Sequence, residues 1–175
     1  MIKHTTEDLH HAIDINNING VRKILRESAI LIDRTFQIDR NKIYEPPMNT
    51  LHRSIRSAVN NLSSSRFDVN LQIIELLFRS GAQCSSVPRH NTLNFGIYMV
   101  NKSIKSREHT LVAEKNALSV LEILIKNGAI PNNDTESSFE YNTFSAIMRT
   151  QNLMILRFVM DKNLSLRPNN TSFGE

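Results

Sequence analysis

The 175-residue sequence contains one cysteine, no tryptophan, and only five glycines and five prolines. A single cysteine, Cys84, excludes an internal disulfide framework and is typical of a reducing compartment such as the cytoplasm. The scarcity of glycine and proline argues against a β protein with many tight turns and favours helices joined by a few loops. We therefore expect an all-α fold. The chain length is that of one domain, which would span 1–175.

Long hydrophobic runs are also missing. The longest are short, as at 29–32 and 97–100, whereas a membrane span needs about 20 apolar residues. The N-terminal residues MIKHTTEDLHH are polar and contain acids, so we expect neither a signal peptide nor a transit peptide. The charge is mildly basic, with 21 Lys and Arg against 17 Asp and Glu, and no dense basic tract. This balance permits an acidic partner but does not suggest nucleic-acid binding. The lack of long apolar runs leads us to expect no membrane partner.

The sequence lacks the short motifs that carry chemistry. It has no nucleophile elbow, phosphate-binding loop, dinucleotide fingerprint, HExxH motif or EF-hand loop. The six histidines and Cys84 do not show the paired spacing of metal ligands. We therefore expect no catalytic residues, no metal and no cofactor. An unrecognised enzyme site around Cys84, with His52 or His90 as the base, is an alternative hypothesis.

Internal repetition is the strongest signal in the sequence. Asn-Thr followed by Leu or Phe occurs at 49–51, 91–93 and 142–144, and each copy starts an apolar pattern with helical spacing. Asparagine is a preferred N-cap, so Asn49, Asn91 and Asn142 are predicted to start helices. An earlier and weaker copy begins near Leu9, with Thr5 or Thr6 as its cap.

A second apolar pattern follows each copy and ends in a similar way. The endings are IIELLFRSGA (73–82), LEILIKNGA (121–129), ILRFVMDKNL (155–164) and, in the earlier copy, VRKILRESA (21–29). Gly81 and Gly128 are predicted left-handed C-caps, with Asn163 as the usual substitute. A two-helix unit cannot bury its apolar stripe alone, so we expect the units to stack on one another.

This layout resembles the ankyrin repeat, whose pattern is TPLHxAA, a short turn, a second helix of the form VVxLLL and a closing Gly-Ala. The leading Leu is matched by Leu9, Leu51, Leu93 and Phe144, and the following apolar position by Ile13, Ile55, Ile97 and Met148. The family histidine is matched by His10 and His52, which the resemblance makes structural. The Thr-Pro of the family pattern is replaced by Asn-Thr at 49–50, 91–92 and 142–143. The resemblance implies a solenoid of stacked helix-turn-helix units; an irregular helical bundle is the alternative.

The spacing departs from the family. The leading residues are 42, 42 and 51 positions apart, whereas the ankyrin period is about 33. We expect repeats at about 5–36, 47–88, 89–138 and 140–167, with a polar tail at 168–175. In the fourth repeat Ile147 replaces a small residue, which suggests that nothing lies behind it and that this repeat is terminal.

The excess residues fall in a long connection at 30–48 and in insertions at 59–70 and 101–117. The first insertion is predicted to be an open loop. The second is predicted to lengthen both helices around a turn near 107–110, with Ile104, Leu111 and Val112 continuing an apolar stripe. The sequence leaves open whether these insertions are solvated decoration or extra contact surface.

In ankyrin stacks the first helices and loop tips line a concave binding face. The resemblance places on that face His11, Asp14, Arg53, Arg56, Phe95, Tyr98, Met99 and Arg149, with Tyr44, Arg89 and Tyr141 in loops. Six of these are our predicted partner-binding residues: Arg53, Arg56, Phe95, Tyr98, Met99 and Arg149. Arginine, aromatic residues and methionine are enriched at interface centres. Alternatively, Phe95 and Tyr98 pack under the insertion of their own repeat.

The resemblance favours a protein-binding module without catalysis, which acts as an inhibitor, adaptor or scaffold on a partner with acidic or phosphorylated groups. In layout the chain is similar to small ankyrin kinase inhibitors, to viral mimics of the NF-κB inhibitor and to ankyrin effectors of intracellular bacteria. Those comparisons allow the cytoplasm, the nucleus or a host cytosol. Besides the enzyme hypothesis, nucleic-acid binding through the basic insertion 101–117 is a further alternative.

Overall fold

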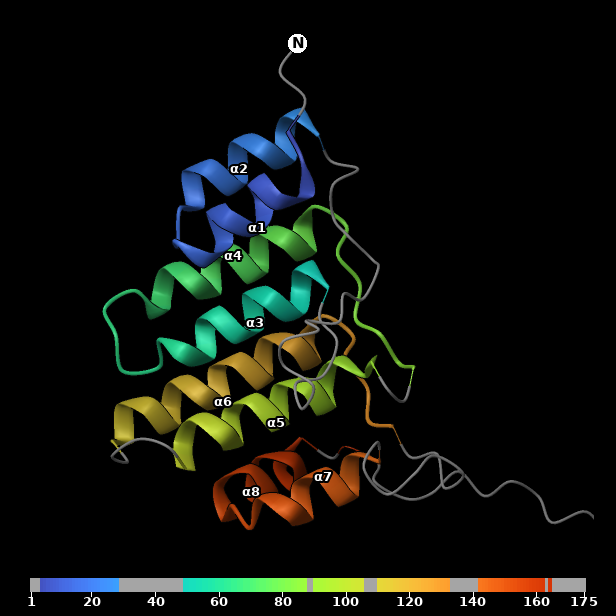
Figure 1. The fold of residues 1–175 in the computed structure, drawn as a ribbon. Coiled ribbons are helices and arrows are strands. Elements are labelled where there is room, and N and C mark those ends of the chain that lie inside the picture. Colours follow the sequence, from blue (N-terminus) through green and yellow to red (C-terminus); the bar gives the residue numbers. More distant parts are fainter. Residues whose placement is uncertain are drawn as a thin grey trace, which may run out of the picture.

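The computed structural model describes residues 4–28, 49–87, 90–105, 110–132, 142–162 and 164. Those residues form eight α-helices and contain no strand, which confirms the all-α prediction for the described part of the chain (Figure 1). The helices are α1 (Thr6–Asp14), α2 (Ile18–Glu27), α3 (Thr50–Asn60), α4 (Phe67–Arg79), α5 (Thr92–Lys105), α6 (Leu111–Lys126), α7 (Thr143–Thr150) and α8 (Leu153–Asp161). The expected connection at 30–48 and the tail at 168–175 lie outside the described residues.

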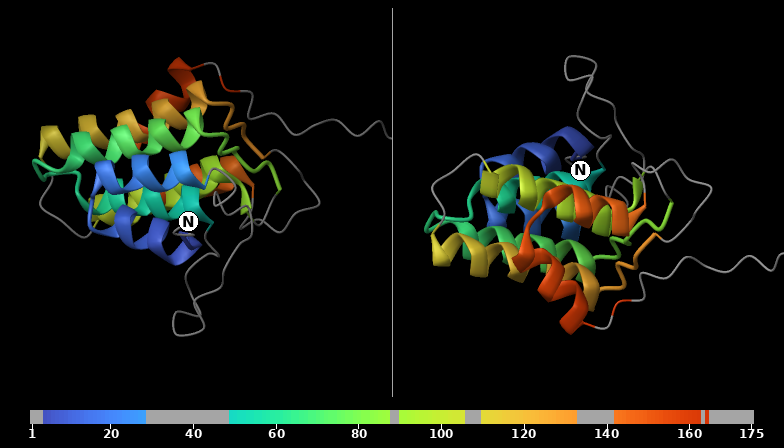
Figure 2. Two further views of the ribbon diagram at one scale, coloured as in Figure 1. Left: turned by 90° about the horizontal axis from the view of Figure 1, so that it is seen from above. Right: turned by 90° about the horizontal axis from the view of Figure 1, so that it is seen from below.

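Consecutive helices pair into four hairpins that stack in chain order (Figure 1). The first helices α1, α3, α5 and α7 contact one another in sequence, and so do the second helices α2, α4, α6 and α8. Each hairpin lies within one of the repeat ranges expected from the sequence. Views along the stack show that the two middle hairpins extend further than the outer two at one end (Figure 2).

The predicted asparagine caps start three of the first helices. The side chains of Asn49, Asn91 and Asn142 accept hydrogen bonds from the backbone N–H three residues later, at 2.9, 2.9 and 3.3 Å. Thr5 caps α1 and forms a capping box with Asp8. The hydrogen bond from the Thr5 backbone N–H lowers the pKa of the Asp8 carboxyl. All four first helices therefore begin at a residue whose side chain caps the first turn.

The predicted glycine caps are also present. Gly81 and Gly128 have φ of +99° and +88°, a left-handed conformation that favours glycine. Ala82 N–H donates to the carbonyl of Leu77, and Gly81 N–H donates to that of Phe78, both at 3.0 Å. The bonds after Gly128 repeat this pair, so α4 and α6 end in the same Schellman arrangement. Asn163 lies outside the described residues.

The prediction of an open loop at 59–70 is wrong. Helix α3 continues to Asn60 and α4 begins at Phe67, which leaves only 61–66 between them. Val59, Leu62 and Phe67 are buried in the core shared by the middle hairpins, because the lengthened third hairpin covers them. Ser103 Oγ donates to the carbonyl of Val59 at 3.1 Å.

The insertion at 101–117 lengthens α5 and α6 as predicted, and residues 106–109 lie outside the described part. Asn116 Nδ2 donates to the carbonyl of Leu62 at 2.7 Å and so joins the two lengthened hairpins. Ile104 is buried, but Leu111 and Val112 are exposed. The predicted apolar stripe therefore stops at Ile104, and in the first turn of α6 only Ala113 is buried.

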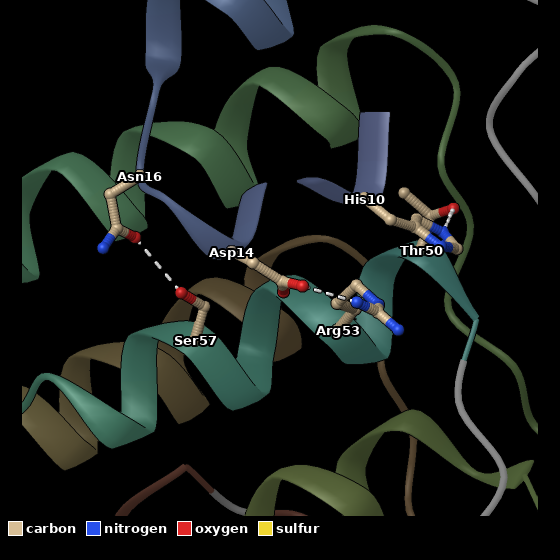
Figure 3. Close-up of polar contacts among 6 residues, drawn as sticks. All are labelled: His10, Asp14, Asn16, Thr50, Arg53 and Ser57. Carbon is tan, nitrogen blue, oxygen red and sulfur yellow. Dashed lines mark hydrogen bonds and ion pairs between the residues drawn. The ribbon is translucent and has the colours of Figure 1, made fainter. Parts of the chain in front are cut away.

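A polar contact joins each first helix to the next. His10 Nε2 lies 2.9 Å from Thr50 Oγ1, and His52 Nε2 lies 3.3 Å from Thr92 Oγ1. In the fourth hairpin Thr143 Oγ1 donates to Asn94 Oδ1 at 2.6 Å. The six side chains occupy equivalent positions in four hairpins. The threonine of each Asn-Thr pair therefore connects its hairpin to the previous one, and Figure 3 shows the first of these contacts.

In the fourth hairpin, the buried and exposed positions differ from those expected from the sequence. Ile147 is 2% exposed and packs into the core, so its size does not indicate an empty space behind it. Phe144 and Met148 were matched to buried residues of the other repeats but are exposed. The reason is that their counterparts face the following hairpin, and no described helix follows α8.

Candidate protein-binding face

The predicted partner-binding residues lie on α3, α5 and α7, the first helices of the second, third and fourth hairpins. Tyr98 on α5 is exposed, while Arg53 and Arg56 on α3 are half-buried. Arg149 lies on α7, but its side chain is outside the described residues, as are Tyr44, Arg89 and Tyr141. The structure thus gives side-chain positions for five of the six predicted residues.

Two of those five are not available to a partner. Phe95 and Met99 are only 5% and 8% exposed. The ring of Phe95 stacks on the imidazole of His52 from the previous hairpin, with centroids 4.3 Å apart and planes inclined by 5°. Met99 belongs to the core shared by the middle hairpins. The prediction that Phe95 and Met99 contact a partner is therefore wrong, because neighbouring hairpins cover both side chains.

Arg53 is held by an ion pair between the first two hairpins. Its Nη1 lies 2.6 Å from Asp14 Oδ2, and both side chains are partly exposed. Ser57, one turn further along α3, donates at 3.1 Å to Asn16 Oδ1, so α1 and the turn after it contact α3 at three successive polar points (Figure 3). Asp14 and Arg53 neutralise each other, so this pair adds little net charge to the surface of α3.

Tyr98 has a cationic neighbour that the sequence prediction did not include. Lys102 follows it by one helical turn, and Lys102 Nζ lies 6.0 Å from the centre of the Tyr98 ring. This is the outer limit of a cation–π contact. The four-residue separation of a tyrosine and a lysine on one helix was the available signal. Arg56 and Tyr98 each lie six residues after the threonine of their Asn-Thr pair, so they occupy equivalent positions. The two helices that carry them, α3 and α5, are in contact.

The charge of these helices differs from that of their hairpin partners. Helices α3, α5 and α7 contain five cationic residues (Arg53, Arg56, Lys102, Lys105 and Arg149) and no aspartate or glutamate. Helices α4, α6 and α8 contain four cationic and five acidic residues. The contrast is confined to these three hairpins, because α1 contains three acidic residues and no lysine or arginine. We call the exposed side of α3 and α5 around Arg56, Tyr98 and Lys102 the basic face.

Cys84 does not have the surroundings of a nucleophile. Its thiol lies 3.6 Å from the carbonyl oxygen of Asn127 and 4.0 Å from that of Leu124, at the end of α6. Burial raises the pKa of the Cys84 thiol to about 11. The group is therefore protonated at neutral pH, whereas a nucleophilic cysteine needs a lowered pKa. His52, one of the bases considered for it, contacts Thr92 through Nε2.

Among residues that the structure describes, no group of three or more His, Cys, Asp or Glu side chains is arranged to hold a metal ion. None of the described helices combines the length and the apolar character needed to cross a lipid bilayer. The chain matches no protein-family model, no curated protein and no solved structure.

Proposed function

We propose that this chain is a degenerate ankyrin-repeat protein that binds an acidic partner protein through the basic face. The main support is the charge of three first helices: α3, α5 and α7 contain five cations and no carboxylate. Complementary charge accelerates association and selects among partners. The protein would act by occupancy, as an inhibitor, adaptor or scaffold, without a chemical step.

The ankyrin assignment has support from details that recur in two or more of the hairpins. These are the asparagine caps, the Gly-Ala ends and the polar contact from one first helix to the threonine of the next. Each arises at the same place in a repeat despite irregular spacing. A chance arrangement of helices gives no reason for such regularity.

The chemistry of the basic face suits a carboxylate- or phosphate-bearing surface. A guanidinium can bind either group through two parallel hydrogen bonds, as Arg56 would do. Tyr98 supplies a rigid aromatic contact beside it, and Lys102 adds positive charge. The partner is therefore expected to present acidic or phosphorylated side chains on a convex element that fits across α3 and α5.

Affinity capture from the native host with matched charge reversals tests this proposal. We expect Arg56→Glu and Tyr98→Ser each to abolish retention of a partner that wild-type protein holds. Lys115→Glu and Lys126→Glu, exposed changes on α6, match the charge change of Arg56→Glu and should retain the partner. If the control variants lose the partner as fully as the test variants, and the wild-type protein binds heparin, the protein would instead be a general polyanion binder. Unchanged partners in the α3 and α5 variants would refute the proposal.

A further inference from the structure

The hairpins share a register that shows which side chains face the next hairpin. A backbone N–H after α4, α6 and α8 donates to the carbonyl five residues earlier, and so marks one equivalent position in each second helix. These bonds run from Ala82 to Leu77, from Ala129 to Leu124 and from Leu164 to Val159. Leu77, Leu124 and Val159 are thus equivalent, and the other positions of the second helices follow by counting from them. Equivalent positions of the first helices follow by counting from Thr50, Thr92 and Thr143.

The second hairpin directs five apolar side chains toward the third. Leu51, Ile55, Leu71, Ile74 and Phe78 belong to the core that these hairpins share or pack against it. The equivalent residues of the third hairpin lie in or against the same core and are Leu93, Ile97, Leu118, Leu121 and Ile125. These five equivalent positions are therefore apolar in both hairpins and lie in or against the shared core, as the contact between stacked repeats requires.

The fourth hairpin keeps all five positions apolar. They are Phe144, Met148, Leu153, Leu156 and Met160, which we call the C-terminal face. Leu156 is half-buried, and the other four are 46 to 67% exposed. A contiguous apolar surface across two helices is characteristic of an interaction site in a folded protein.

The opposite end of the stack is polar. The exposed side chains of α1 and α2 are polar or charged, apart from Ile15 in the turn between them. Head-to-tail stacking of two copies would therefore bury charged groups such as Lys23 and Arg26 against apolar side chains, which is costly. Contact between two C-terminal faces buries apolar side chains on both sides and closes the assembly with two-fold symmetry.

We propose that the C-terminal face binds the same face of a second copy, giving a two-fold dimer of α7–α8 hairpins. Residues 165–175 of the chain contain only Leu166 and Phe173 as large apolar residues, too few to cover five. Two short helices a side make a contact near the lower size limit of specific interfaces, about 1,000 Å². The dimer is therefore expected to dissociate in the micromolar range and to leave the basic face open.

Sedimentation equilibrium of the full chain, from low micromolar to near-millimolar concentration, tests the proposal. We expect the mass to rise from that of a monomer to that of a dimer and not beyond it. Met148→Lys and Phe144→Lys should each weaken dimerisation at least tenfold without changing the circular dichroism spectrum, since both side chains are exposed in the monomer. Leu111→Lys, a matched change at an exposed leucine of α6, should dimerise like wild type.

Three results would overturn the proposal. One is a wild-type chain that stays monomeric throughout. Another is a lysine variant at Met148 that dimerises normally. The third is a monomeric wild-type chain that dimerises once Phe173 is changed to Ser. That result would mean that the chain's own tail covers the C-terminal face. Arg56→Glu should dimerise like wild type, so failure here and failure of the proposed partner binding are separate outcomes.

Discussion

The imidazole of His52 and the hydroxyl of Thr92 meet 3.3 Å apart between the second and third hairpins, where both residues are almost fully buried. Thr92 Oγ1 also accepts a hydrogen bond from the backbone N–H of Ser85 at 2.8 Å, and Thr92 N–H donates to the Ser85 carbonyl at 3.0 Å. Asn132 and Thr143 repeat this exchange in the next hairpin. One threonine thus fixes a connecting loop, a helix start and a hairpin contact.

Thr92→Val should therefore lower the free energy of unfolding by about 2 kcal/mol. The substitution keeps the volume but leaves the buried imidazole of His52 and the partly buried N–H of Ser85 without the hydroxyl, and such a loss costs about 1–3 kcal/mol. Thr92→Ser keeps the hydroxyl and should cost less. Urea denaturation measures both values, and an equal effect of the two variants would show that the hydroxyl contacts are unimportant.

Gly81→Ala and Gly128→Ala should each cost about 1 kcal/mol, because a side chain at positive φ is strained. An added Cβ would meet nothing within 4 Å at either site, so the cost is conformational and not steric. Asparagine tolerates this conformation, and Gly81→Asn should cost less than Gly81→Ala. Thermal unfolding of the three variants provides the comparison; equal stability of the alanine variants and wild type would contradict the C-cap assignment.

Leu62→Ala should cost about 2–4 kcal/mol, which is usual for truncating a buried leucine. The residue lies in the short turn between α3 and α4, where an open loop would make the change nearly neutral. Leu111→Ala is the matched control, since Leu111 is 85% exposed and should change stability by less than about 0.5 kcal/mol. Comparable effects at both leucines would mean that the lengthened hairpins do not pack together.

Cys84 should react slowly with iodoacetamide in the folded protein. Because burial raises its pKa from 9.0 to about 11, the thiolate fraction at pH 8 is about 100-fold lower than in the unfolded chain. The same shift makes stability fall as pH rises from about 9 to 11, since only the unfolded state releases the proton there. Cys84→Ala should lose less stability over that range. Rapid alkylation at pH 8 under native conditions would contradict the assigned surroundings.

The local features of this fold were accessible from the sequence because they depend on neighbouring residues. Asn49 caps a helix three residues away, and Gly81 ends one through its own backbone conformation. Burial depends on groups distant in the chain, and there the predictions failed. Phe95 is covered by His52, and Leu62 by the lengthened third hairpin. Phe144 shares the pattern of buried residues but is exposed, because no described hairpin follows it.

Binding through the basic face predicts a change in lysine reactivity, which can be measured once a partner has been captured. Lysine acetylation of the free protein should modify both Lys102 on α5 and Lys126 on α6, since both side chains are exposed. Mass spectrometry of the complex compares the two sites within one molecule. We predict that partner binding protects Lys102 at least severalfold and leaves Lys126 unchanged. Protection of Lys126 with full modification of Lys102 would contradict recognition through the first helices.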